Sequence, residues 1–292
     1  MDDSTSLSKL FGDLFKTPRP IIEGSSALIV SANLLHLNEV QMLPIVRGLE
    51  ERTDPITGIK MYPTLGGYAL LKAILGTNPK DCMELIWEPC RDFALWIGSV
   101  KYTDTLSDLT KVFDLTKFGD AIVESPENIK ALVTIQDVLL LYKSNIMKST
   151  VSVSEIGTDI VAVQHDSGIL HALRVMFQKG VRRVFLEDER KNSAFSFVSS
   201  RHILRFLFSP ARLEMAKTNP ESWVDARLSE VGWSDARVIR DGKTINQAAR
   251  EIGNQVDDCL VCEPTNMVVS RWDLVMKPWK MNSYSFRRKK DS

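Results

Sequence analysis

The chain has 292 residues, of which 44% are hydrophobic and 25% are charged, a composition typical of globular protein and not of disordered chains. Lysine plus arginine and aspartate plus glutamate both total 37, so no overall charge draws the chain towards nucleic acid, an anionic membrane or an acidic substrate. No window approaches a transmembrane span, and the first residues, MDDSTSLSKLFGDLFK, lack an unbroken apolar run. Together with four unevenly spaced cysteines, these features predict a cytoplasmic protein with reduced thiols and no membrane partner.

Residues 1–17 predict an amphipathic helix at the start of the chain. An apolar stripe at helical spacing has to cover another apolar surface. We expect it to pack on the rest of the chain, with docking on another protein as the alternative. The stripe consists of Leu7, Leu10, Phe11, Leu14 and Phe15.

A hydroxyl residue followed by a helix-like apolar segment recurs four times along the rest of the chain. Thr64, Thr134, Ser199 and Ser270 open these segments, at intervals of 70, 65 and 71 residues. Regular spacing of this kind is the signature of internal repeats. A short apolar run that predicts a strand precedes each hydroxyl, at residues 43–46, 121–124, 183–186 and 259–262.

A stretch with helical period comes before each of these strands, and its ends carry helix signals. The first, residues 27–37, is nearly continuous in apolar residues, whereas Thr105 opens the second and Asp108 completes a capping box with it. Gly180 ends the third, where a helix favours a left-handed residue, and Thr244 is the expected N-cap of the fourth. Each repeat therefore reads strand, helix, strand, strand and helix, and at about 70 residues it needs a partner to bury its apolar surface.

This arrangement resembles the cystathionine β-synthase (CBS) domain, in a four-repeat chain whose tandem pairs form two Bateman modules. The strongest stretches are GILHALRVMFQKGVRRVFL followed by FVSSRHILRF, and FGDAIVESPENIKALVTIQDVLLLY. The resemblance implies an α/β (α+β) fold of four β-α-β-β-α repeats. The implied boundaries are an N-terminal helix at 1–17, a first pair at 18–146 (repeats at about 18–77 and 90–146), a second pair at 147–279 (repeats at about 151–210 and 222–279) and a basic tail at 280–292.

The resemblance implies that the hydroxyl-x-x-Asp element of each repeat touches a nucleotide, commonly an adenosine ligand. An ionised Asp137 can accept hydrogen bonds from both ribose hydroxyls, and Thr134 can contact the sugar or the phosphate. The start of the following helix offers free N–H groups to phosphate oxygens. The same two residues would also form an ordinary capping box, worth about 1 kcal/mol without any ligand, and spacing alone does not separate the two interpretations.

The acid of this element is kept in only two of the four repeats. The second and fourth have Asp137 and Asp273, whereas the first has Gly67 and the third has His202. If the resemblance holds, each module keeps one competent site, and His202 is expected to cap its helix or face solvent in preference to contacting a ligand. The predicted binding residues are Thr134 with Asp137, Ser270 with Asp273, and, in the degenerate clefts, Ser199 with His202, and Thr64.

The resemblance also implies positive charge for phosphate and an apolar slot for adenine. Arg182 and Arg183 are the basic pair of the family pattern, but alternation along a strand sends one of them to solvent, and Arg183 is the predicted contact. The slot is formed in the family by two strands, whose aliphatic residues also suit an ordinary core. The implied slot residues are Ile97, Ile122 and Leu132 at one site and Val238, Leu260 and Val268 at the other.

The sequence offers little to a catalytic interpretation. Its four histidines show no metal-ligand spacing, and it contains no phosphate-loop lysine motif, no GxSxG and no GxGxxG. Cys259 and Cys262 lie in an apolar run that predicts a buried strand with the two thiols on opposite faces. We prefer that interpretation to a zinc site completed by Cys82 and Cys90.

The sequence therefore predicts a non-catalytic regulatory protein that needs no cofactor and binds an adenine nucleotide between paired CBS repeats. AMP, ADP and ATP are the expected ligands, ahead of S-adenosylmethionine. A ligand that prefers one arrangement of the modules would shift that arrangement and the surface that a partner protein reads. A homodimer is the expected assembly, since paired modules of this family often stack.

RNA binding is the alternative function. The C-terminal run FRRKKDS, residues 286–292, places four cations just after Trp279 and Tyr284. A solvated tail is the usual meaning of such a run, but aromatic rings beside cations also suit RNA, through base stacking and phosphate contacts.

Overall fold

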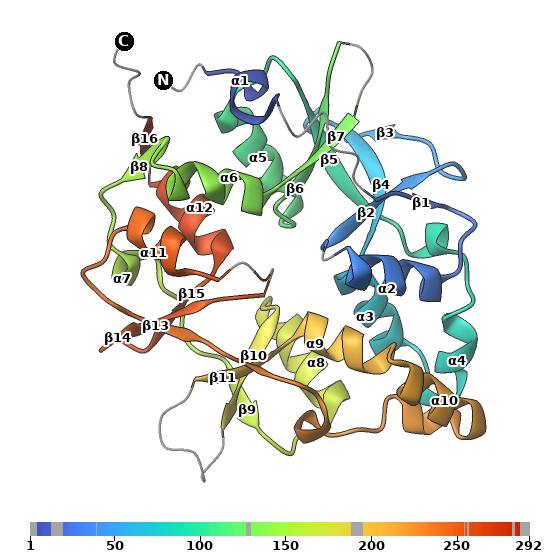
Figure 1. Ribbon diagram of the computed structural model, residues 1–292. Coiled ribbons are helices and arrows are strands. Elements are labelled where there is room, and N and C mark those ends of the chain that lie inside the picture. The colour runs from blue at the N-terminus through green and yellow to red at the C-terminus, as the bar shows by residue number, and fades with distance from the viewer. Residues whose placement is uncertain are drawn as a thin grey trace.

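The computed structural model describes residues 5–12, 20–38, 40–126, 130–187, 195–253, 255, 257–281 and 284–286. Four successive repeats of strand, helix, strand, strand and helix make up most of this part of the chain (Figure 1). The first two contain β1 Ile22–Glu23, α2 Leu28–Leu37, β2 Met42–Val46, β4 Lys60–Gly66 and α3 Gly67–Gly76, then β5 Leu95–Lys101, α5 Leu106–Thr116, β6 Asp120–Glu124, β7 Lys130–Thr134 and α6 Ile135–Lys143. The last two contain β9 Ala162–Gln164, α8 Ile169–Lys179, β10 Arg183–Glu187, β11 Ser196–Ser199 and α9 Ser200–Leu207, then β13 Arg237–Arg240, α11 Ile245–Glu251, β14 Leu260–Glu263, β15 Met267–Val269 and α12 Arg271–Lys280.

Shorter elements connect the repeats. Before and within the first pair they are α1 Leu7–Phe11, β3 Arg52–Thr53, the 3-10 turns η2 Pro79–Asp81 and η3 Cys90–Phe93, and α4 Cys82–Leu85. Further along the chain they are β8 Met147–Ser149, α7 Val153–Ile156, α10 Pro210–Thr218, η4 Pro220–Trp223, η5 Leu228–Glu230, β12 Ser234–Asp235 and β16 Tyr284–Phe286.

Local sequence signals explain where the predicted helices begin and end. The Thr105 side chain accepts a hydrogen bond from Asp108 N, and the Asp108 carboxylate accepts one from Thr105 N, so α5 opens on the predicted capping box. Thr244 caps α11 in the same way. Helix α8 ends at Gly180, whose φ of 65° is the left-handed conformation that glycine adopts without strain. These helix ends are confirmed as the sequence predicted them.

Sheets join the first repeat to the second and bring the third close to the fourth. One sheet runs β1-β2-β4-β5-β6-β7, and its two halves meet where β4 pairs antiparallel with β5, Tyr62 opposite Ile97. The third and fourth repeats form the sheets β12-β11-β10-β9 and β13-β14-β15. Phe197 of the third repeat and Val261 of the fourth share one buried apolar cluster, so these two sheets pack on each other.

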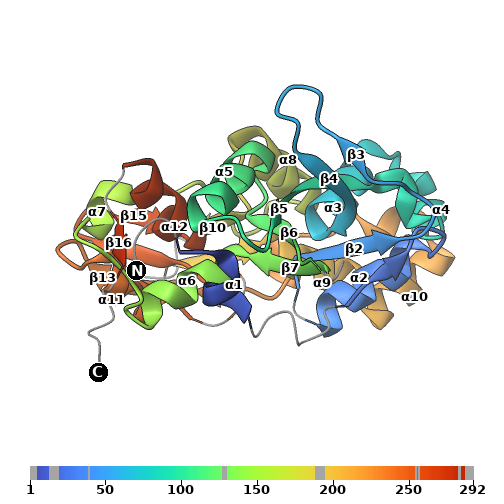
Figure 2. The same cartoon turned by 90° about the horizontal axis from the view of Figure 1, so that it is seen from above.

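Helices make the other two contacts, from the first repeat to the third and from the second to the fourth. Helix α3 packs on α8 and α9, and α6 packs on α11 and α12. The two large core clusters follow this division: Leu70 and Leu173 belong to one, Leu139 and Ala248 to the other. The four repeats consequently surround a common centre in Figure 1, and the view in Figure 2 shows that the assembly is flattened.

The N-terminal helix packs on its own chain, as the first of the two alternatives expected. Leu7 and Phe11 are buried in the core of the second and fourth repeats, and Leu10 packs against it. Leu14 and Phe15 lie outside the described residues, as do residues 287–292 of the basic tail, so the RNA interpretation stays a prediction. No helix in the described part of the chain is long and apolar enough to cross a membrane.

Candidate functional site

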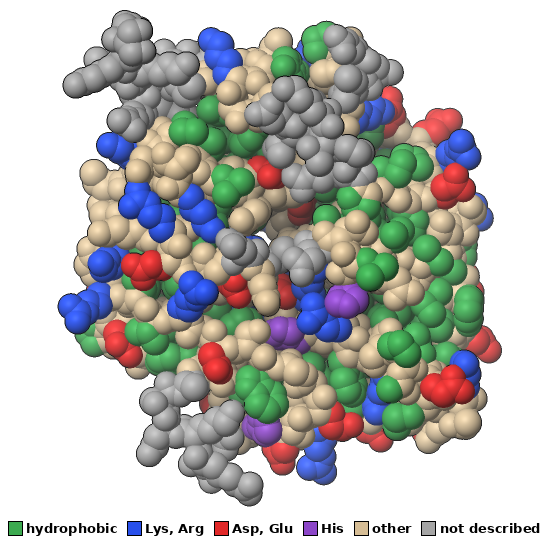
Figure 3. All heavy atoms as spheres, in the orientation of Figure 1, with side chains coloured by type: hydrophobic (Ala, Val, Ile, Leu, Met, Phe, Trp, Pro, Cys, Tyr) green, Lys and Arg blue, Asp and Glu red, His purple; other side chains and the backbone are tan. Residues whose placement is uncertain are grey.

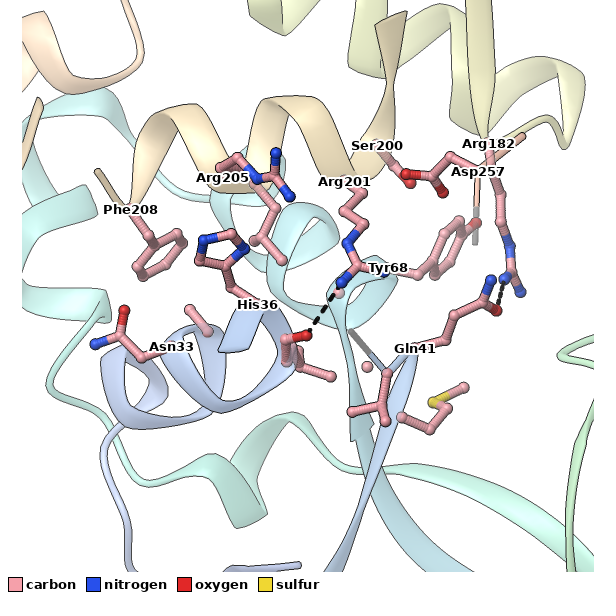
Figure 4. Close-up of a pocket in the computed structure, with 17 residues that line it drawn as sticks. Asn33, His36, Gln41, Tyr68, Arg182, Ser200, Arg201, Arg205, Phe208 and Asp257 are labelled. Atoms are coloured by element: carbon pink, nitrogen blue, oxygen red, sulfur yellow. Dashed lines mark hydrogen bonds between the residues drawn. The ribbon is translucent and has the colours of Figure 1, made fainter. Parts of the chain in front are cut away.

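A hollow lies between the first and third repeats, where α2, β2 and the start of α3 face α9 (Figure 4). It contains about 770 Å³ that protein atoms do not occupy, with its opening to solvent included. Figure 3 shows basic and histidine side chains gathered near the centre of one face, where the repeats meet. The polar, charged and aromatic side chains that line the hollow are Asn33, His36, Gln41, Tyr68, Arg182, Ser200, Arg201, Arg205, Phe208 and Asp257.

Three guanidinium groups make the hollow positive. Arg201 and Arg205 lie one turn apart on α9, so both side chains project from the same face of that helix. Arg182 precedes β10, and its Nη1 donates to Gln41 Oε1 at 2.7 Å (Figure 4). Asp257 is the only acid among the described lining residues, so positive charge is in excess.

The start of α3 adds to this positive potential. Gly66 is its N-cap and offers no side chain to the first N–H groups, while Gly66, Gly67 and Tyr68 all line the hollow. The first N–H groups of a helix carry partial positive charge and favour an anion. A Cβ at Gly66 would be crowded, because it would lie 2.6 Å from Met42 Sδ and 3.0 Å from Gln41 O.

The prediction for the first repeat was wrong by two residues. Thr64 does not open α3 but lies inside β4, fully buried, where its hydroxyl donates to Leu95 O at 3.3 Å. Since the helix begins at Gly67, the positions that correspond to the hydroxyl and the acid are Gly66 and Ala69, not Thr64 and Gly67. Strand β4 is longer than the corresponding strands of the other repeats and also pairs with β3. This extra length shifted the helix start away from the position that the repeat pattern predicted.

The two acids predicted to bind ribose are both buried and both cap their own helices. Asp137 Oδ2 accepts from Thr134 N and from Thr134 Oγ1, each at 2.8 Å. Asp273 Oδ2 accepts from Ser270 N at 2.9 Å and from Ser270 Oγ at 2.6 Å. With exposures of 7% and 5%, neither acid faces bulk water. Capping uses one oxygen of each acid, and Asp273 Oδ1 lies 3.5 Å from Lys277 Nζ. The role of both acids as ribose ligands stays a prediction.

His202 replaces the acid in the cap of the third repeat, as expected. Its Nδ1 accepts from Ser199 N at 3.2 Å, and Ser199 Oγ accepts from His202 N at 3.1 Å. Because Nδ1 is an acceptor, the neutral ring carries its proton on Nε2, which lies 3.3 Å from Ser234 Oγ. Burial lowers the pKa of His202, while Asp257 opposes the shift.

Replacing His202 by asparagine is expected to make stability less dependent on pH. The unfolded chain protonates this residue at an ordinary pKa of about 6.5, whereas the folded chain does so at a lower pH. The unfolded state therefore binds more protons as the pH falls through about 6.5, and the free energy of unfolding decreases until the lower pKa of folded His202 is passed. Asparagine keeps an oxygen acceptor for Ser199 N and does not titrate.

Urea denaturation of wild type and His202→Asn at about pH 7.5 and about pH 5.5 measures this difference. The wild type is expected to lose more stability between the two values than the variant does. His165→Asn, in the turn between β9 and α8, serves as the matched control and should follow the wild type. Equal losses in all three proteins would contradict a buried neutral His202.

Both arginines of the predicted basic pair are half-buried, so neither is fully exposed as strand alternation had predicted for one of them. Arg182 reaches across to the first repeat and Phe118 O of the second. The guanidinium of Arg183 lies 5.7 Å from the Phe197 ring, and its Nη1 is buried without a hydrogen-bond partner among the described residues. Both faces of β10 are covered because other repeats pack around it.

The predicted apolar slots have different outcomes. Ile97, Ile122 and Leu132 lie together in one buried cluster with Met42 and Tyr62. The second set does not come together. Val268 belongs to the cluster between the third and fourth repeats, Leu260 to the helix-covered core on the other face, and Val238 is 44% exposed.

The four cysteines are all free and buried. Cys259 and Cys262 point to opposite faces of the strand, as predicted, since they belong to different core clusters. The described residues contain no group of three or more His, Cys, Asp or Glu side chains that could hold a metal ion.

Sequence reasoning missed the residues that make the hollow. The sequence shows Arg201 and Arg205 as two cations at helical spacing, but it does not indicate that they lie against α2. Arg201 donates to Leu35 O across a separation of 166 residues. Such a site depends on how repeats pack, and local patterns do not report that.

Solved structures supply the comparison with known proteins. No family model matches the chain, and no curated protein matches it in sequence. A crystal structure of a protein from Methanocaldococcus jannaschii, described as a proposed archaeal homologue of g-AMPK, is similar with a TM-score of 0.74 at 14% identity, over 93% of this chain and 99% of that chain. An uncharacterised conserved protein from Pyrococcus horikoshii has a TM-score of 0.50 at 14% identity, over 82% of this chain and 91% of that chain.

A CBS-domain protein from Agrobacterium tumefaciens covers 47% of this chain and 92% of its own length, at 15% identity and a TM-score of 0.36. The observed order of elements, strand, helix, strand, strand and helix, occurs four times here. The fold of this chain is that of the CBS-domain proteins, with four repeats.

Proposed function

We propose that this chain is a non-catalytic regulatory protein that binds an adenine nucleotide, AMP, ADP or ATP, in the hollow between the first and third repeats. The observation that carries the proposal is the convergence of three guanidinium groups and a helix start without a side-chain cap on one hollow. In the described part of the chain, the last helices of the other three repeats do not have this arrangement. Helices α6, α9 and α12 all begin with capping contacts from side chains at their own starts.

The charged side of the hollow suits phosphate. A guanidinium group presents its N–H donors in a planar fork that matches two phosphate oxygens. Arg201 and Arg205 supply two such forks from α9, and the N–H groups at the start of α3 approach from the opposite wall. A mononucleotide can be held by these groups without a lysine-containing phosphate loop.

The remainder of the wall suits a nucleoside. Tyr68 and Phe208 lie towards opposite ends of the hollow (Figure 4), and Leu204 and Met42 add apolar surface. An aromatic ring can stack on adenine. The likeness in fold to a proposed homologue of g-AMPK supports an adenine nucleotide in preference to other phosphorylated ligands.

Regulation follows from the composition of the hollow. Its two walls belong to different sheet-joined pairs, α2, β2 and α3 on one side and α9 on the other. A ligand that contacts both walls binds best to one relative position of the pairs, and it shifts the population towards that position. The homodimer and the protein partner expected from the sequence remain predictions.

Calorimetry with AMP, ADP and ATP tests the site. Arg205→Gln and Arg201→Gln are each expected to weaken binding at least about tenfold, because a charge-assisted hydrogen bond contributes about 1.5–3 kcal/mol. Arg174→Gln is the matched control, since Arg174 is exposed on α8 and does not line the hollow. It should bind as the wild type does.

Asp137→Asn distinguishes the hollow from the cleft predicted by sequence. It is expected to leave affinity within about twofold of the wild type, because Asp137 does not line the hollow. Loss of binding in Asp137→Asn with unchanged Arg201 and Arg205 variants would move the site to that cleft. Absence of binding by any of the three nucleotides to the wild type would overturn the proposed function.

A further inference from the structure

Asp257 brings a negative charge into a hollow that otherwise favours anions. It belongs to the fourth repeat and follows α11, yet it lines the hollow between the first and third repeats. Its Oδ2 accepts a hydrogen bond from Ser199 Oγ at 2.7 Å, and Ser199 is the fully buried N-cap of α9. The carboxylate therefore lies beside the start of an eight-residue helix, a position that favours negative charge.

The arginines that line the hollow do not form ion pairs with this carboxylate. Arg182, Arg201 and Arg205 form no ion pair with a carboxylate in the described part of the chain, although all of them line the hollow with Asp257 (Figure 4). Asp257 acts on them through space. Arg182 already donates to Gln41 Oε1 and Phe118 O, and Arg201 Nη2 to Leu35 O, so the donors left for a ligand are the remaining N–H groups of Arg201 and those of Arg205. An anion that enters the hollow meets these attractive groups together with one like charge.

A buried guanidinium binds the backbone of the segment just before Asp257. Arg271 is only 4% exposed, and its Nη2 donates to Gly253 O at 2.8 Å and also to Gln255 O, two residues before Asp257 in the chain. Its Nε and Nη1 have no partner among the described residues. Burial lowers the pKa of Arg271 to about 10, and Asp258 and Asp257 oppose this shift, so the acids stabilise the buried cation.

We propose that Asp257 sets the selectivity of the hollow by charge, disfavouring more highly charged phosphates, so that it holds a nucleoside monophosphate in preference to a triphosphate. This inference rests on the proposed function, because it concerns the same hollow. The repulsion between Asp257 and a ligand grows with the ligand's charge, whereas ribose and adenine contacts are common to AMP and ATP. Asp257 is thus a specificity-determining residue and not a catalytic one.

The test compares AMP, ATP and inorganic pyrophosphate binding to wild type and Asp257→Asn by calorimetry at constant ionic strength. Asparagine keeps an oxygen that accepts from Ser199 Oγ, so only the charge is removed. Affinity for ATP and pyrophosphate is expected to rise at least about tenfold, and affinity for AMP about threefold or less, because the removed repulsion scales with ligand charge. Asp257→Ser, with the charge also removed, should shift affinity in the same direction.

Asp235→Asn is the matched control. Asp235 also accepts a hydrogen bond from a serine hydroxyl, Ser196 Oγ at 2.6 Å, in the neighbouring sheet, but it does not line the hollow. This variant should keep the wild-type ratio of ATP to AMP affinity. A thermal melt of every variant accompanies the binding data.

The outcomes separate the two proposals. Nucleotide binding to wild type with an unchanged or lower ATP to AMP affinity ratio in Asp257→Asn overturns the role of Asp257 and leaves the proposed function standing. Tighter pyrophosphate binding by Asp257→Asn, with no nucleotide bound by either protein, supports the role of Asp257 and overturns the nucleotide. Failure of both variants to fold would make Asp257 structural and also overturn the inference, as would absence of binding by all three ligands.

Discussion

Trp223→Ala is expected to lower the free energy of unfolding by roughly 3–5 kcal/mol, the range for removing a large aromatic side chain from a core. Trp223 is fully buried in η4, which packs on α10 and, across the interface with the first repeat, on η2 and α4. Its Nε1 donates to Leu207 O, and its ring meets that of Phe208 edge to face with centroids 5.5 Å apart. Alanine would leave a cavity and an unpaired carbonyl at the end of α9.

Urea denaturation measures this loss of stability. It is monitored by far-ultraviolet circular dichroism in place of tryptophan fluorescence, because the variant lacks a tryptophan. Trp87→Ala is the matched control, because Trp87 is 66% exposed and its removal is expected to change stability by about 0.5 kcal/mol or less. Since Phe208 lines the hollow, nucleotide affinity should fall together with stability in Trp223→Ala. A stability loss near that of Trp87→Ala would show that the interface repacks around the cavity.

The parts of the fold that could be predicted from the sequence are those that local chemistry determines. A glycine is favoured where α8 ends in the left-handed region, and a threonine with an acid or amide three residues later satisfies N–H groups at the starts of α5 and α11. Each of these signals acts within a few residues. Four copies of them at regular intervals were sufficient to indicate the repeats.

Local chemistry also explains why the candidate site was not predicted. The hydroxyl-x-x-Asp pattern marks a helix start, but the acid that marks it accepts from the N–H of the N-cap residue, as Asp137 and Asp273 do. Helix α3, which lacks the pattern, keeps a start without a side-chain cap, and this start lines the hollow. A search for the family acid therefore selects the helix starts that have side-chain caps, and it misses the start of α3, which has none.

The sequence could not predict which helices of different repeats pack together, for a different reason. Helix α2 is apolar on nearly all of its surface, so its pattern does not say which face meets another repeat. Only the packed structure sets its residues against α9, and this contact brings His36 and Arg205 into one hollow. Long-range packing of this kind selects among several surfaces that are equally apolar in sequence.

One buried amide adds hydrogen bonds to the apolar interface between the second and fourth repeats. Asn246 on α11 is 8% exposed, and its Nδ2 donates to Tyr142 O at 2.8 Å and to Met147 O at 2.7 Å. Its Oδ1 accepts from Ser149 N at 3.1 Å. These groups belong to the end of α6 and to β8, so the fourth repeat holds the segment that joins the two halves of the chain.

Asn246→Ala is expected to cost roughly 2–4 kcal/mol, because two carbonyls and one N–H would stay buried without their partners. Asn38→Ala is the matched control: Asn38 is exposed and makes a single side-chain hydrogen bond, to Leu34 O, so its loss should cost about 1 kcal/mol or less. Urea denaturation of both variants gives the comparison. Equal losses would mean that water satisfies the buried groups, and the joining segment would then be held by apolar packing of Met147 and Val151 in place of the amide.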